Sequence, residues 1–121
     1  MQSYKRSTRV AELIQKEISK LLREIKDPEL GFVTITSVKL TDDLQDARVF
    51  YSVIGSEEQK LKTKTILLDS LKHIRHELAS TINMRRTPTL EFEYDDTPEK
   101  ATHIFEIFEK ISKEEESKPK E

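Results

Sequence analysis

The sequence predicts an α+β domain in which a three-stranded sheet packs against helices, in the order α-β-β-α-(break)-α-β-α. Three observations support this fold class. Apolar residues recur at steps of three and four in several segments, which is helix spacing. Two neighbouring segments alternate between apolar and polar residues, which is typical of a β-hairpin. A later strand follows a helical crossover and should lie parallel to one strand of that hairpin.

The first helix is expected from about Ser7 to Lys26. Asp27-Pro28 should end it, because the residue before a proline is steered out of the α region. The face opposite the apolar stripe is cationic, which on its own is typical of an ordinary solvated surface. The stripe consists of Val10, Leu13, Ile14, Ile18, Leu21, Leu22 and Ile25.

The hairpin follows from two alternating segments, Phe32–Leu40 and Ala47–Ile54. The alternation of the first changes phase near Thr36-Ser37, which predicts a β-bulge. The second is partly apolar on both faces, as expected for a central strand. The connecting turn begins at Thr41 and contains two aspartates.

A second helical region begins at Ser56, where Ser-Glu-Glu-Gln is a capping-box pattern. A single straight helix from there to Ile82 would be roughly 40 Å long. A domain of this size has a radius of gyration of about 14 Å, so such a helix would overhang it. On a straight helix, Lys60 and Lys64 would also lie in line with the apolar stripe of Leu71 and Leu78, so we expect a break between about Lys64 and Lys72.

The last strand is expected around Leu90, Phe92 and Tyr94, and the last helix begins at Thr97-Pro98-Glu99, with its apolar stripe ending at Ile111. All five phenylalanines and two of the three tyrosines fit core positions. Residues 1–112 then form one domain of the 121-residue chain, and residues 113–121, which are charged and lack large apolar side chains, are expected to be a mobile tail.

Composition excludes several classes of protein. No cysteine is present, which rules out disulfide scaffolds, Cys-ligated zinc, iron–sulfur clusters and thiol nucleophiles. Cysteine-free composition fits a reducing cytoplasm, so a cytoplasmic location is expected. No apolar run reaches the roughly 18–20 residues that would span a bilayer, and no apolar signal-peptide core appears, so no membrane contact is expected.

Catalytic patterns are weak. His73 and His76 share a helix face approximately, but zinc needs a third ligand that the sequence does not indicate. The aspartate pairs 42–43 and 95–96 fall in turns, where aspartate commonly bonds the nearby backbone. With no glycine-rich phosphate loop either, we expect no catalytic residue, metal, cofactor or small-molecule substrate.

Charge is segregated along the chain although the net charge is only −2. Residues 1–26 carry seven basic and three acidic side chains, and residues 60–86 carry seven and two. The acidic segments are residues 27–59, with two basic and seven acidic side chains, and 87–121, with five and eleven. Two separated basic segments indicate a surface for a polyanion such as a nucleic acid.

The chain resembles the bacterial ribosome-binding factor A family over about residues 4–111. The resemblance rests on the order and spacing of short motifs: Arg6-x-x-Arg9-Val10, Asp27-Pro28, Val33-Thr34-Ile35-Thr36-x-Val38, Asp43-Leu44-x-x-Ala47-x-Val49, Tyr51-Ser52-Val53-x-Gly55, Ile74-Arg75-x-x-Leu78, and Met84-Arg85-x-x-Pro88-x-Leu90-x-Phe92 followed by Asp95.

The resemblance implies a type II KH-like domain in which a kink between two helices takes the place of the usual GxxG loop. The family marks that kink with Ala-x-Gly, whereas this chain has Ser70-Leu71-Lys72, and it also has Ala101 where the family has glycine in the last helix. On this basis we expect RNA to be bound by Arg6, Arg9, Lys72, Arg75, Arg85 and Arg86.

The resemblance also implies a non-enzymatic role, in which a monomer binds free 30S ribosomal subunits and assists late maturation of 16S rRNA, including processing of its 5′ end. The family is linked to growth in the cold. Two alternatives follow from the residues. One is a protein–protein interaction module without RNA binding, which would use Phe105, Phe108 and the acidic tail. The other is a small acid/base or metal enzyme.

Overall fold

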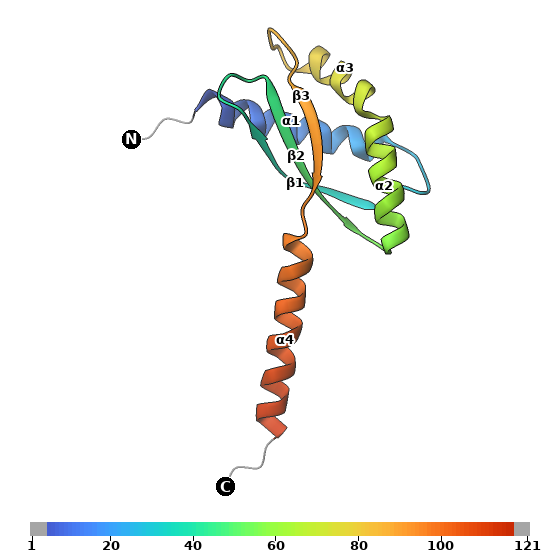
Figure 1. Cartoon of the computed structure of the whole chain (residues 1–121), viewed down its shortest axis with the longest axis vertical. Coiled ribbons are helices and arrows are strands. Elements are labelled where there is room, and N and C mark those ends of the chain that lie inside the picture. The colour runs from blue at the N-terminus through green and yellow to red at the C-terminus, as the bar shows by residue number, and fades with distance from the viewer. Residues whose placement is uncertain (1–4, 118–121) are drawn as a thin grey trace.

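Figure 1 shows the computed structural model, which describes residues 5–117. The α+β class and the predicted element order are confirmed. The elements are α1 (Arg6–Glu24), β1 (Phe32–Leu40), β2 (Asp46–Ile54), α2 (Glu57–Asp69), α3 (Leu71–Thr81), β3 (Thr89–Tyr94) and α4 (Thr97–Ser117).

The sheet has the strand order β1-β2-β3, with β1 antiparallel and β3 parallel to the central strand β2. The predicted bulge is present, because Ile35 pairs with Tyr51 and Ser37 with Phe50, which leaves Thr36 without a partner. Because Thr36 is an extra residue, the inward-pointing side chains shift by one position after it. Val38 therefore packs against the core, as Val33 does before the bulge.

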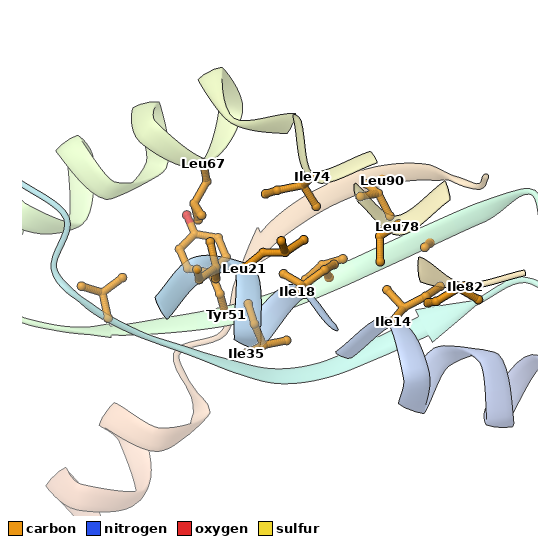
Figure 2. Close-up of a cluster of buried hydrophobic side chains, with 14 residues drawn as sticks. Ile14, Ile18, Leu21, Ile35, Tyr51, Leu67, Ile74, Leu78, Ile82 and Leu90 are labelled. Atoms are coloured by element: carbon orange, nitrogen blue, oxygen red, sulfur yellow. The ribbon is translucent and has the colours of Figure 1, made fainter. Parts of the chain in front are cut away.

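The core lies between the sheet and the helix pair α1 and α3 (Figure 2). Helix α1 contributes most of its predicted stripe, but Leu13 of that stripe is 52% exposed, because it lies at the edge of the apolar face. The ring of Tyr51 on β2 makes edge-to-face contacts with Phe92 and Tyr94 of β3. Helices α1 and α3 contact each other and run in roughly opposite directions (Figure 1). The fully buried aliphatic side chains include Ile14, Ile18, Val49, Leu67, Ile74 and Leu78.

The second helical region breaks at Ser70, within the predicted interval. Ser70 ends α2 and begins α3 with a helical backbone conformation (φ −85°, ψ −5°). Its N–H donates to the Ile66 carbonyl and its carbonyl accepts from the Ile74 N–H, each at 2.9 Å. Hydrogen bonding therefore continues across the break, so the chain kinks without forming a loop.

The capping box at Ser56 is also confirmed. The Ser56 hydroxyl accepts from the Gln59 N–H at 3.2 Å, and the Gln59 side chain accepts from the Ser56 N–H at 2.9 Å. These bonds satisfy two backbone donors that a helix start leaves without partners, which is why α2 begins where the sequence predicts.

Helix α4 departs from the prediction, because it projects away from the sheet and packs against none of its core (Figure 1). The expectation that every phenylalanine occupies a core position is wrong: Phe32, Phe105 and Phe108 are 74%, 69% and 63% exposed. An amphipathic stripe predicts that a helix has an apolar face, but not that another element of the same chain covers it.

Helix α4 also continues to Ser117, into the segment 113–121 that the sequence predicts as a tail. Lysine and glutamate are good helix formers, and no glycine or proline interrupts the chain between Pro98 and Ser117. Residues 118–121 of the predicted tail lie outside the described residues. Within residues 5–117, no helix combines the length and the apolar character needed to cross a membrane.

Candidate nucleic-acid interface

The start of α1 lies beside the chain that follows α3, and this brings three of the predicted cations together. Arg6, Arg85 and Arg86 line one surface hollow of about 540 Å³. The turn between β1 and β2 forms another part of its wall, through Asp43, Leu44 and Gln45, and Met84 completes the lining. We call this site the arginine hollow.

Hydrogen bonds within the β1–β2 turn define its conformation. The Asp43 carboxylate accepts from the Thr41 hydroxyl at 2.6 Å and from the Gln45 N–H at 3.1 Å. These two bonds hold the pKa of Asp43 below its usual value. Leu44 has a φ of 62° and sits in the left-handed region, which is uncommon for a residue with a side chain. These hydrogen bonds and the Leu44 conformation define the shape of this wall of the arginine hollow.

The three guanidinium groups are available to a ligand. Arg6, Arg85 and Arg86 are exposed, and no ion pair among the side chains of residues 5–113 includes any of them. Asp43 is the single acid that lines the hollow, and its carboxylate already accepts two hydrogen bonds. A guanidinium presents several donors in a plane that matches phosphate oxygens, so this arrangement suits a phosphate backbone.

Arg75 has a partly structural position. Its Nε donates to the Pro88 carbonyl at 3.3 Å, and one terminal nitrogen donates to the Thr87 carbonyl at 3.4 Å. The side chain thereby fastens α3 to the segment that leads from Arg86 into β3. Arg75 helps to position the arginine hollow in addition to carrying a charge beside it.

Lys72 and Arg9 do not line the hollow. Lys72 is exposed near the start of α3, next to the kink at Ser70, and roughly 14 Å of helix axis separates it from Thr81. Arg9 is exposed one turn after Arg6 on α1. The six predicted residues thus form a cluster of three, a positioning residue and two outlying cations.

Aspartates of the two sequence pairs, 42–43 and 95–96, accept hydrogen bonds that stabilise the fold. Asp95 accepts from the Thr36 hydroxyl at 2.7 Å and from the Thr97 N–H at 3.0 Å. The Thr97 side chain, the Thr36 hydroxyl and the Thr97 N–H lower the pKa of Asp95. Asp42 accepts from the hydroxyl of Ser7 at 3.3 Å. In the part of the chain that the structure describes, no three histidine, aspartate or glutamate side chains gather as a metal site.

The turn residues of the hollow are not among the residues that the sequence predicts for the site. Asp43-Leu44 is recognisable only as a turn and a family motif, because the sequence does not show which end of the sheet meets the start of α1. The bond between Ser7 and Asp42 joins those two segments in the structure. Such a contact between residues far apart in sequence leaves no periodic signal.

The sequence is similar to known proteins over most of its length. A family model described as ribosome-binding factor A matches residues 6–108. The chain is 44% identical over 111 residues to a ribosome-binding factor A of Desulforamulus reducens, covering 91% of this chain and 92% of that protein.

Two solved structures share the fold. A solution structure of a Thermotoga maritima protein described as a putative ribosome binding factor A matches with a TM-score of 0.67 and 28% identity, covering 77% of this chain and 90% of that one. A Thermus thermophilus ribosome binding factor A model, fitted into a cryo-EM map of its 30S complex, matches with a TM-score of 0.62 and 24% identity, covering 74% and 94%. These similarities confirm the type II KH-like fold class.

Proposed function

The chain belongs to the ribosome-binding factor A family, and from that premise we propose that it is a ribosome assembly factor that binds free 30S subunits. Its further role is to assist late maturation of 16S rRNA, including processing of the 5′ end, and it does so without catalysis. The Thermus thermophilus relative supports the choice of subunit, since its model was fitted to a 30S complex.

The observation that carries the proposal is the arginine hollow on a chain of this family. Three exposed arginines, none of which forms an ion pair with another side chain of residues 5–113, line one hollow together with the β1–β2 turn. Phosphate contacts of this kind position a protein on RNA without reading its sequence. Recognition should therefore depend on the shape of the rRNA and the path of its backbone.

Phosphate contacts also suit an assembly factor that must dissociate from the subunit when maturation is complete. Affinity from counterion release falls steeply with salt and disappears when the backbone moves away from the cations. A surface that fits an immature rRNA conformation would thus release the RNA when the mature conformation forms. The carboxylates at the turns already accept hydrogen bonds from the chain itself, which agrees with a non-catalytic role.

Cosedimentation tests the proposal. The purified protein should pellet with 30S subunits and not with complete ribosomes, and the bound fraction should fall steeply between about 50 and 200 mM salt. Cells that lack the protein should accumulate 16S rRNA with an unprocessed 5′ end, most strongly in the cold. Equal binding to complete ribosomes, or binding that does not respond to salt, would contradict the proposal.

A further inference from the structure

Helix α4 exposes an apolar surface that the proposed RNA contact does not use. Along one side of the helix lie residues at 44–69% exposure, and the two phenylalanines are the most exposed of them. We call this surface the α4 stripe; it consists of Ile104, Phe105, Ile107, Phe108 and Ile111. A contiguous exposed apolar surface on a helix commonly marks an interaction site.

The first turns of α4 are anchored to the domain by their polar side. Glu99 pairs with the ammonium group of Lys60 at 2.6 Å and accepts a hydrogen bond from the Tyr94 hydroxyl. Lys60 lies over the Tyr94 ring and also pairs with Glu57 at 3.1 Å. Its side chain is only 20% exposed, so the aliphatic part packs against the domain as well.

This anchoring turns the α4 stripe away from the rest of the chain. A hollow of about 340 Å³ between α4 and the end of β2 is lined, on the α4 side, by polar residues. At about 100° per residue, Thr102 and Glu106 lie on the helix side opposite the middle of the stripe. The chain's own sheet therefore cannot cover the stripe while Glu99 holds Lys60. The polar residues in that hollow are Glu99, Thr102, His103 and Glu106.

The charges of α4 indicate what does cover the stripe. Residues 97–117 carry six acidic and three basic side chains. Glu109 lies about 40° around the helix from Phe105, and in the sequence three glutamates occupy positions 114–116, after Ser112 and Lys113. The carboxyl end of a helix is also the negative end of its dipole. RNA phosphates are repelled by such a surface, whereas lysine and arginine side chains are attracted to it.

We propose that α4 is a docking helix that inserts its stripe into an apolar groove, bordered by lysine and arginine, on a protein of the small ribosomal subunit. An amphipathic helix in an apolar groove is a recurring mode of recognition, and buried aromatic side chains usually carry most of its affinity. The choice of a ribosomal protein rests on the function proposed above. The arginine hollow would then contact rRNA while α4 contacts a neighbouring protein.

Two binding assays with one pair of variants test this assignment. Phe105→Ala with Phe108→Ala removes the aromatic anchors and keeps helix propensity, and both side chains are exposed, so folding should be unchanged. We expect this variant to bind 30S subunits at least about tenfold more weakly than the wild type and to bind protein-free 16S rRNA equally well. The matched control is Thr102→Ala with Lys113→Ala on the opposite side of α4, which should change neither affinity.

Photo-crosslinking identifies the occupant. A benzophenone side chain at position 105 should crosslink to a small-subunit protein when the factor is mixed with 30S subunits. A crosslink to 16S rRNA, an equal loss of affinity for protein-free rRNA, or a crosslinked pair of copies of this chain would overturn the docking proposal. So would 30S binding that the alanine pair leaves unchanged. If the wild type itself fails to bind 30S subunits, the proposed function is contradicted, and so is the choice of a ribosomal protein as the docking partner.

Discussion

At the scale of single residues, Thr63 joins α2 to the chain that enters β1. Its hydroxyl is fully buried and accepts the N–H of Gly31 at 2.9 Å. A Cβ at Gly31 would lie 2.6 Å from a methyl group of Val53 on β2 and 3.2 Å from the Thr63 hydroxyl on α2, so this position has room only for glycine. This contact fixes how α2 sits at the end of the sheet.

Thr63→Val should therefore destabilise the fold although it keeps the size of the side chain. It leaves the N–H of Gly31 without an acceptor, which costs about 1–3 kcal/mol. Urea denaturation measures the change in the free energy of unfolding. Thr65→Val is the matched control, because Thr65 is exposed and bonds only within its own helix; equal stability of the two variants would contradict the assigned contact.

The pair of Lys60 and Glu99 predicts a pH dependence with a definite sign. The Lys60 ammonium and the Tyr94 hydroxyl lower the pKa of Glu99, while Glu99 and Glu57 raise the pKa of Lys60. A lowered carboxyl pKa gives stability that is complete above the unfolded value of about 4.3 and is lost as the pH falls through the folded value. The raised Lys60 pKa gives stability that is lost only as the pH rises through its folded value.

Glu99→Gln should thus lower the melting temperature most at neutral pH. The difference from the wild type should close as the pH falls below about 4, because the wild-type carboxyl is then protonated too. Melting curves followed by circular dichroism between about pH 3 and 8 provide the measurement. A difference that stays constant over this range would mean that the charge of Glu99 contributes nothing.

At the scale of elements, Arg75 is expected to affect stability and Lys72 is not. The Arg75 side chain bonds two carbonyl groups of the segment before β3, while the Lys72 side chain makes no hydrogen bond or ion pair with residues 5–113. Arg75→Ala should lower the free energy of unfolding by about 1 kcal/mol. Lys72→Ala should stay within about 0.5 kcal/mol of the wild type in the same urea titration, and equal effects would argue against the fastening role.

Removal of most of α4 is expected to leave the rest of the fold intact. All side chains of residues 97–113 are exposed, so the helix adds little burial beyond the anchor at Glu99. A chain that ends at Thr102 keeps this anchor and should melt within about 3 °C of the full chain. Differential scanning calorimetry tests this, and a much larger drop would show that the stripe packs against the domain in solution.

Elements with strong local signals were predictable, and the contacts between them were not. The capping box at Ser56, the bulge near Thr36 and the break near Ser70 each follow from local rules that the structure confirms. Lys60 shows the limit of such rules: it lies on the inward side of α2, where a lysine is unexpected, and is stabilised there by Glu99 and Glu57. The inward position of Lys60 depends on Glu99, which is distant in sequence, so local rules do not predict it.

The candidate site was predictable as a set of residue types and not as a geometry. Charge segregation and family motifs single out six cations, but the antiparallel packing of α1 and α3 decides which of them meet. The exposure of the phenylalanines of α4 escapes prediction for a related reason, because helical periodicity describes a face and not its partner.

At the scale of the whole molecule, the basic and acidic segments of the chain form different elements. The basic segments 1–26 and 60–86 supply α1 and most of the kinked pair α2 and α3, whereas the acidic segment 87–121 supplies β3 and α4. Under the function proposed above, the basic elements would face the rRNA and the anionic helix α4 would not, and this separation of charge would orient the approach to the subunit.

The salt dependence of 30S binding tests the central claim, that the arginine hollow holds the rRNA backbone. The affinities of wild type, of Arg85→Gln with Arg86→Gln, and of Lys110→Gln with Lys113→Gln are measured across a range of salt concentrations. The arginine variant should bind more weakly, and its logarithmic salt slope should be shallower by about 0.7–0.9 for each phosphate that it no longer neutralises. The lysine variant, which removes the same charge from exposed positions on α4, should match the wild type in both respects. An arginine variant with the affinity and slope of the wild type would contradict the account.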